Sequence, residues 1–213
     1  MQFTDRAHAA KLLSNKLKKF AHDPKGIVLA IPRGGVELGA VLADELQLSL
    51  DVVVSKKICA PGNPEFAIGS VNMRGEVVLN TDDLGTTPAK EYIDTEVARV
   101  KQAIQEKLRT LRGTRPFPDL KGKHVIVVDD GIATGSTMKG ALEYVRAERP
   151  DVLIMAVPVA PVGARDQFDP WCDEILILSE EPSLGSVGAF YNDFPQVEDS
   201  RAKQLLTTRW LSA

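Results

Sequence analysis

The clearest structural pattern in the chain is the segment His124-Val-Ile-Val-Val-Asp-Asp-Gly-Ile-Ala-Thr-Gly-Ser-Thr-Met138. Its apolar run predicts a buried parallel strand over residues 125–128, and residues 135–144 predict the helix that follows. The turn between them offers hydroxyl and backbone N–H groups at a helix N-terminus, which suits a phosphate. Asp129 and Asp130 stand beside it and suit a sugar hydroxyl or a phosphate-bound cation. The stretch therefore predicts a site for a phosphate and a polyol together; the simpler alternative is an ordinary capped turn.

The rest of the chain alternates apolar runs with helical patterns. Further strands are expected at residues 26–31, 51–55, 152–159 and 174–178, with helices between them. Such alternation indicates an α/β protein with a mostly parallel, Rossmann-like sheet and helices on both faces. A hairpin, residues 66–71 with 76–79, and a long helix that opens at Thr87-Pro88 interrupt the pattern. We expect them to form an inserted flap over about residues 60–118, within a single domain spanning residues 1–213.

Composition limits the classes of partner. Hydrophobic residues make up 44% of the 213 residues, as in ordinary globular proteins. The net charge of -3 gives no general attraction to nucleic acid or to an anionic membrane surface. Residues 1–20 lack a continuous apolar stretch, so neither a signal peptide nor a membrane span is expected, and the protein is predicted to be cytoplasmic. Cys59 and Cys172 follow no metal or redox spacing and are expected to be reduced and structural.

Ligands of an open parallel sheet bind at the carboxyl ends of its strands, so binding residues are also expected after the other strands. After the first strand, Pro32-Arg33-Gly34-Gly35 combines a cation with two glycines whose N–H groups can approach a ligand closely. Gly34 and Gly35 also loosely match a dinucleotide-binding turn. That kind of site needs an acid after the second strand, where this chain has Lys56 and Lys57. The two lysines suit a pyrophosphate, although one of them should point away from it and a solvated pair is the alternative.

A last loop combines aromatic and acidic side chains, Ser186-Val-Gly-Ala-Phe-Tyr-Asn-Asp-Phe194. Phe190, Tyr191 and Asp193 are candidates for recognising a flat ring, on which an aromatic side chain can stack. A packing role for Phe190 or Phe194 is equally compatible with the sequence. In the expected flap, Pro61-Gly-Asn-Pro-Glu-Phe-Ala-Ile-Gly69 places Glu65 where a mobile cover would meet a substrate, although an exposed loop glutamate is the commoner case.

Together these motifs resemble the type I phosphoribosyltransferases, and most closely a group of bacterial and archaeal members without an assigned substrate. The resemblance implies that Asp129 and Asp130 hold the ribose hydroxyls of 5-phosphoribosyl 1-pyrophosphate. It assigns the 5′-phosphate to Ala133, Thr134, Gly135, Ser136 and Thr137. It assigns the pyrophosphate to Arg33, Gly34, Gly35 and one of Lys56 and Lys57. The family often has a non-proline cis peptide in this pyrophosphate loop, which here would be Pro32–Arg33.

The resemblance also implies a reaction, transfer of the phosphoribosyl group to a nitrogenous base with release of pyrophosphate. Mg²⁺ is the expected cofactor, held by pyrophosphate and ribose oxygens with at most a water bridge to Asp129 or Asp130, and family members are commonly homodimers. The motif departs from the 6-oxopurine enzymes at Ala133, where they carry a third acid. Since alanine cannot exchange a proton, this argues against hypoxanthine or guanine as acceptor. Two other classes remain open: a regulatory protein that binds the donor without transfer, and a different phosphate-ester enzyme on a Rossmann-like sheet.

Overall fold

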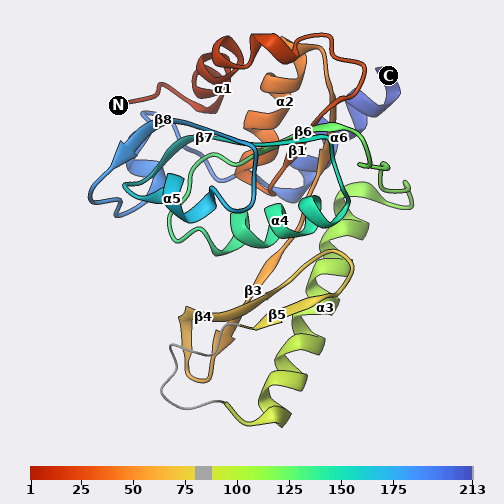
Figure 1. Ribbon diagram of the computed structural model, residues 1–213, viewed down its shortest axis with the longest axis vertical. Coiled ribbons are helices and arrows are strands. Elements are labelled where there is room, and N and C mark those ends of the chain that lie inside the picture. The colour runs from red at the N-terminus through yellow and green to blue at the C-terminus, as the bar shows by residue number, and fades with distance from the viewer. Residues whose placement is uncertain (80–87, 213) are drawn as a thin grey trace.

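A five-stranded parallel sheet forms the centre of the molecule (Figure 1), in the order β2-β1-β6-β7-β8. The computed structural model describes residues 1–79 and 88–212, apart from the side chains of residues 64, 65, 78, 211 and 212. The strands are β1 (Gly26–Ala30), β2 (Ser49–Val52), β6 (His124–Val128), β7 (Val152–Pro161) and β8 (Glu174–Glu181). All are joined by parallel pairing, with Ala30 of β1 level with Val128 of β6. The predicted fold class is confirmed.

Helices cover both faces of this sheet because its strands are apolar on both sides. Val28 and Val128 belong to the core under α1 (Arg6–Lys16), α2 (Gly34–Leu46) and α6 (Asp199–Ser212). Their neighbours Leu29 and Val127 face the opposite core, under α4 (Ser136–Ala147) and α5 (Ala164–Phe168). Short 3-10 helices follow α1 (η1, Lys18–Phe20) and β8 (η3, Val187–Phe190). Within the described residues, no helix combines the length and the apolar character needed to cross a membrane.

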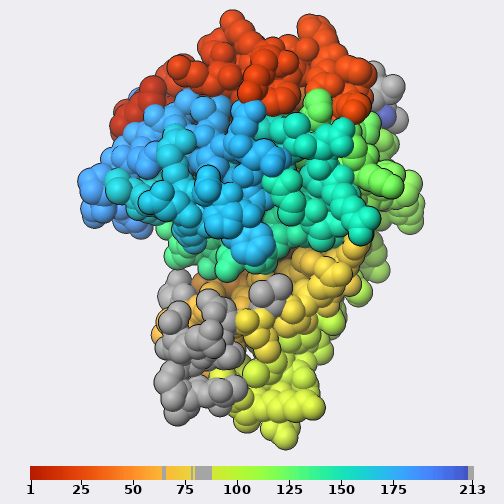
Figure 2. Space-filling view, viewed as in Figure 1, coloured from red at the N-terminus to blue at the C-terminus, as the bar shows by residue number. Residues whose placement is uncertain are grey.

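A second, antiparallel sheet projects from the parallel core. It consists of β3 (Lys56–Ala60), β4 (Asn63–Val71) and β5 (Val77–Leu79), and the long helix α3 (Lys90–Arg112) packs along it (Figure 1). Ile58 and Ile68 of the sheet share a small core with Val100 and Ile104 of α3. Figure 2 shows this insert, coloured orange to yellow-green, at the end of the molecule opposite α1.

The insert is also where the structure departs from the sequence-based expectation. Strand β3 was not predicted, and it carries the insert's sheet back to Lys56 instead of about residue 60. Its inward residues Ile58 and Ala60 are buried, but two lysines precede them and turn residues follow, which masks the strand pattern. Strand β2 correspondingly ends at Val52 rather than Ser55. Helix α3 begins at Lys90, and Thr87 of the expected helix start lies outside the described residues.

Candidate active site

Three chain segments meet at the carboxyl edge of the parallel sheet. The loop after β1 leads through Pro32 and Arg33 into α2, and the peptide bond between these two residues is cis, as expected. The loop after β6 carries the acidic pair into α4. Strand β3 enters the insert beside them at Lys56. Because parallel strands end at one edge, side chains far apart in the sequence share one site.

The two acids of the motif form a tightly packed pair. The Asp130 backbone N–H donates to Asp129 Oδ1 at 2.8 Å, and the Asp130 Oδ2 atom accepts from Arg6 Nε at 2.8 Å. Burial, and secondarily the charge of Asp130, raises the pKa of Asp129 well above its ordinary value. The pair therefore places two carboxyl groups where negative charge is poorly solvated, and hydroxyl donors would stabilise their ionised forms.

Glycine is required beside this pair because the backbone of α2 comes very close to it. A Cβ atom on Gly34 would lie 1.8 Å from Asp130 Oδ2, and one on Gly35 would lie 3.0 Å from Asp129 Oδ1. The predicted role of these glycines was close approach to a ligand. The structure adds a second reason, since they make room for the acids themselves.

Replacing Gly34 with alanine should displace the Asp130 carboxylate, because its methyl group would overlap Oδ2. We expect a loss of about 1–3 kcal/mol in the free energy of unfolding and about a 10-fold loss in affinity for phosphoribosyl pyrophosphate. Chemical denaturation and calorimetric titration measure the two effects. Gly185→Ala is the matched control, because a Cβ there meets nothing within 4 Å. Equal behaviour of the two variants would contradict the packing argument.

The expected phosphate loop is the N-terminal end of α4. Gly135 precedes the helix with a φ of 80°, a left-handed conformation that suits glycine. Ala133 and Thr134 are exposed, while Ser136 and Thr137 are half-buried in the first turn, whose N–H groups have no partner within the helix. The Ser55 hydroxyl donates to the Thr137 carbonyl at 2.8 Å and ties this turn to the segment between β2 and β3. The arrangement can cradle an anion.

Cations line two neighbouring hollows at this edge. One, of about 540 Å³, lies against Thr134 and Thr137 and is lined by Lys56, Lys57 and Lys107. The other, a more open cleft of about 720 Å³, contains Arg33, Gly34 and Asp130 and again Lys56 and Lys107. Lys56 thus borders both hollows, whereas Lys57 borders the first, so the expected choice of a single lysine stays a prediction. A separate hollow beside Trp210 lies at the amino ends of the strands, away from every predicted site residue.

The aromatic segment after β8 is arranged differently from the expectation. Tyr191 is 5% exposed, its ring stacks on Phe194 with centroids 4.8 Å apart, and its hydroxyl donates to the Asp130 carbonyl at 2.6 Å. Burial raises the pKa of Tyr191, so the hydroxyl remains a donor. Burial and stacking on Phe194 favour a packing role for this ring, and contact between Tyr191 and a base stays a prediction. Its place supports the acidic loop.

The neighbouring candidates divide between the core and the surface. Phe190 packs against the core and Asp193 is exposed, and neither lines the cleft. The residues of this segment that line the cleft are Val187, Phe194, Gln196 and Val197. Glu65 lies in β4, but its side chain is outside the described part of the structure, so its predicted role stays a prediction.

Arg6 and Lys107 border the candidate site but were not predicted to, although their positions in the sequence gave an indication. Arg6 is 4% exposed and contacts Asp130, and Lys107 of α3 borders both hollows and pairs with Asp199 of α6 at 2.6 Å. Arg6 stands four residues before Ala10 and so continues the apolar stripe of its helix. Lys107 follows Ile104 by three residues and Val100 by seven, which places it on the same face of α3. A cation on an apolar helix stripe indicates that an opposite charge packs against it.

Comparison with known proteins gives agreement over nearly the whole chain. The family model for the phosphoribosyl transferase domain matches residues 2–176. A Mycobacterium tuberculosis protein provisionally named a phosphoribosyl transferase is 33% identical over 205 residues, which are 96% of this chain and 46% of that protein. The crystal structure of TT1426 from Thermus thermophilus is 37% identical with a TM-score of 0.83, and the match covers 98% of this chain and 99% of that one.

The chain belongs to the phosphoribosyl transferase family, as its motifs implied. The likeness to TT1426 extends over the insert as well as the parallel core, since it covers nearly all of both chains. The chain spans about half the length of the curated relatives that it matches, at 46%.

Proposed function

We propose that the protein transfers the 5-phosphoribosyl group from 5-phosphoribosyl 1-pyrophosphate to a nitrogenous base and releases pyrophosphate. The observation that carries this proposal is the meeting of three chemically distinct groups at one edge of the sheet. The acidic pair suits ribose hydroxyls, the α4 turn suits the 5′-phosphate, and the cations of both hollows suit the pyrophosphate. Each part of the donor thus has a complementary surface.

The proposed reaction breaks the bond between ribose C1′ and the pyrophosphate oxygen and forms a bond from C1′ to a ring nitrogen. Arg33, the Gly34 and Gly35 amides, Lys56 or Lys57, and Lys107 would stabilise the departing negative charge. Asp129 and Asp130 would fix the ribose and favour the positive charge that develops on its ring, an interaction that needs no reorganisation during the reaction. The insert would cover the site and limit hydrolysis of the donor.

Mg²⁺ fits this site with oxygens of the bound donor, rather than protein side chains, as most of its ligands. Among residues 1–79 and 88–212, no three His, Cys, Asp or Glu side chains gather as metal ligands. Mg²⁺ prefers oxygen and retains waters, so pyrophosphate and ribose oxygens, with a water bridge to Asp129 or Asp130, would complete the shell. The ion would supply positive charge at the leaving group.

The acceptor would lie against the apolar side of the cleft, which includes Val187 and Phe194. Phe190, Asp193 and Tyr191 lie between these two residues in the sequence and stay candidates for contacting the base, as does Glu65 of the insert. Ala133 disfavours hypoxanthine and guanine, because it offers no proton-exchanging group at the position where the 6-oxopurine enzymes have an acid. The same absence favours the alternative of a regulatory protein that binds the donor without transferring it.

Pyrophosphate release separates the two candidates. We expect release when the protein is mixed with phosphoribosyl pyrophosphate, Mg²⁺ and one member of a panel of purine and pyrimidine bases, measured by a coupled phosphate assay. Reactions without base, without Mg²⁺, or with Asp129→Asn/Asp130→Asn protein are the controls. Tight donor binding without release for any base would favour the regulatory protein. If calorimetry detects no donor binding, both candidates fail.

A further inference from the structure

The chain's N-terminal segment is hydrogen-bonded to the segment that follows β8. The Phe3 N–H donates to the Phe190 carbonyl at 2.8 Å, and the Asn192 and Asp193 N–H groups donate to the Phe3 and Thr4 carbonyls at 2.8 and 2.9 Å. The two segments therefore run together past the acidic loop. Helix α1 begins directly after this pairing, with Asp5 as its N-cap and Arg6 as its first residue.

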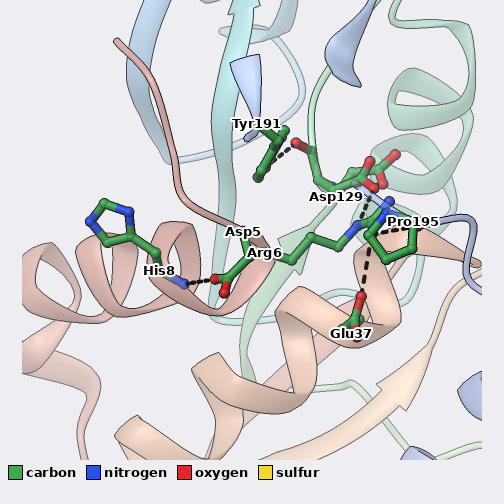
Figure 3. A network of polar contacts seen from close by, with 8 residues as sticks. Asp5, Arg6, His8, Glu37, Asp129, Tyr191 and Pro195 are labelled. Carbon is green, nitrogen blue, oxygen red and sulfur yellow. Dashed lines mark hydrogen bonds and ion pairs between the residues drawn. The ribbon is translucent and has the colours of Figure 1, made fainter. Parts of the chain in front are cut away.

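Arg6 reaches from this point into the site and joins three elements (Figure 3). Its Nε donates to Asp130 Oδ2 at 2.8 Å, and one terminal nitrogen donates to the Pro195 carbonyl at 2.9 Å and to Glu37 Oε2 of α2 at 3.3 Å. The guanidinium carbon lies 3.8 Å from the centre of the Phe194 ring. The acidic loop, α2 and the cleft wall after β8 thus share one cation.

These contacts require the shape of arginine as well as its charge. A guanidinium is a planar fork of donors that can stack on an aromatic ring while it bonds within its plane, whereas an ammonium is a compact point charge. The Arg6 side chain is 5% exposed, and a buried cation is tolerated only when it is paired and hydrogen-bonded. Asp130, whose side chain is 14% exposed, supplies the opposite charge.

The pairing holds the Asp130 carboxylate beside the open cleft. Its Oδ2 atom accepts from Arg6, and Asp130 is one of the residues that line the cleft. The Tyr191 hydroxyl fixes the backbone carbonyl of the same residue. Asp130 is thereby anchored at both its side chain and its backbone, next to the space that a ligand would occupy.

We propose that Arg6 is a positioning residue of the donor site, which orients Asp130 toward the ribose and fixes the Phe194–Pro195 wall relative to it. This rests on the proposed function. Because Arg6 acts through Asp130, its loss should affect ligands that contain the ribose and should spare pyrophosphate alone. The N-terminal segment is then a structural part of the donor site.

The test compares the affinities of two ligands, phosphoribosyl pyrophosphate and inorganic pyrophosphate, by calorimetric titration in the presence of Mg²⁺. Arg6→Gln is expected to weaken the binding of phosphoribosyl pyrophosphate by about 10-fold or more, the effect of losing a hydrogen bond to a charged group. It should weaken the binding of pyrophosphate by less than about 2-fold. Arg6→Lys keeps the charge and should recover only part of the loss. Lys11→Gln, an exposed cation on the same helix, should match the wild type.

A double-mutant cycle distinguishes this positioning role from a general loss of structure. Adding Arg6→Gln to Asp130→Asn should cause less than about 2-fold further loss of donor affinity if the arginine acts through that carboxylate. Unchanged donor affinity in Arg6→Gln, equal weakening of both ligands, or full additivity with Asp130→Asn would overturn the positioning role. If Arg6→Gln does not fold, the same comparison with Arg6→Lys decides. Failure of wild-type protein to bind the donor would instead reject the proposed function.

Discussion

Replacing Arg112 with alanine is expected to lower the free energy of unfolding by about 3–5 kcal/mol, the usual cost of leaving one member of a buried ion pair without its partner. Arg112 is the last residue of α3 and donates two hydrogen bonds to the Asp51 carboxylate of β2, at 2.7 and 2.8 Å. Both side chains are under 10% exposed. The guanidinium also donates to the carbonyls of Arg115 and Pro116, so its loss would remove these two bonds as well as leaving the buried Asp51 carboxylate without its partner. Urea denaturation measures the effect.

Arg109→Ala is the control, because Arg109 is an exposed arginine in the same last turn of α3. Its free energy of unfolding should change by less than about 0.5 kcal/mol. The double variant Arg112→Met/Asp51→Leu removes both charges and should be more stable than Arg112→Ala. A small effect of Arg112→Ala would mean that α3 is not anchored to the parallel sheet through this pair.

The fold could be predicted where local sequence and burial point the same way. The run at residues 125–128 is apolar on both faces because helices cover both sides of β6, and the following glycine-rich turn is specified within a dozen residues. Strand β3 was not predicted, because its buried residues Ile58 and Ala60 face the core of the insert. Their packing partners Val100 and Ile104 lie about forty residues later in the sequence. No local pattern encodes that contact.

The residues of the candidate site could likewise be predicted where they lie close together in the sequence, and not where they meet only in the fold. The acidic pair and the glycine-rich turn after β6 could be recognised because they form one continuous segment, and the family resemblance implied the cis peptide at Pro32–Arg33. Arg6 and Asp130 are separated by 124 positions, so the sequence shows a cation on an apolar stripe but not the carboxylate that it meets. Tyr191 shows the converse limit, since an aromatic residue in a loop can face a ligand or the core with the same sequence.

Replacing Asp130 with asparagine should weaken the binding of phosphoribosyl pyrophosphate by about 100-fold, which corresponds to about 2.7 kcal/mol, within the range for a lost hydrogen bond to a charged group. The amide removes the negative charge that would accept a ribose hydroxyl. If the amide oxygen accepts from Arg6 Nε, the NH₂ group takes the place of the second carboxylate oxygen, and that acceptor is lost to the ribose. Pyrophosphate alone should keep its affinity, because it lies against Arg33 and Lys56 in the proposed mode.

Calorimetric titration of both ligands checks this, with Asp169→Asn as an exposed acid-to-amide control on the nearby α5 end. Stability must be measured in parallel, because Asp130→Asn also leaves Arg6 with Glu37 as its remaining ion-pair partner. A donor affinity equal to that of Asp169→Asn, in protein that remains folded, would refute the assignment of Asp130 to the ribose. Selective loss of donor binding would separate the sugar contact from the pyrophosphate contact, because the two ligands differ by the ribose 5-phosphate alone.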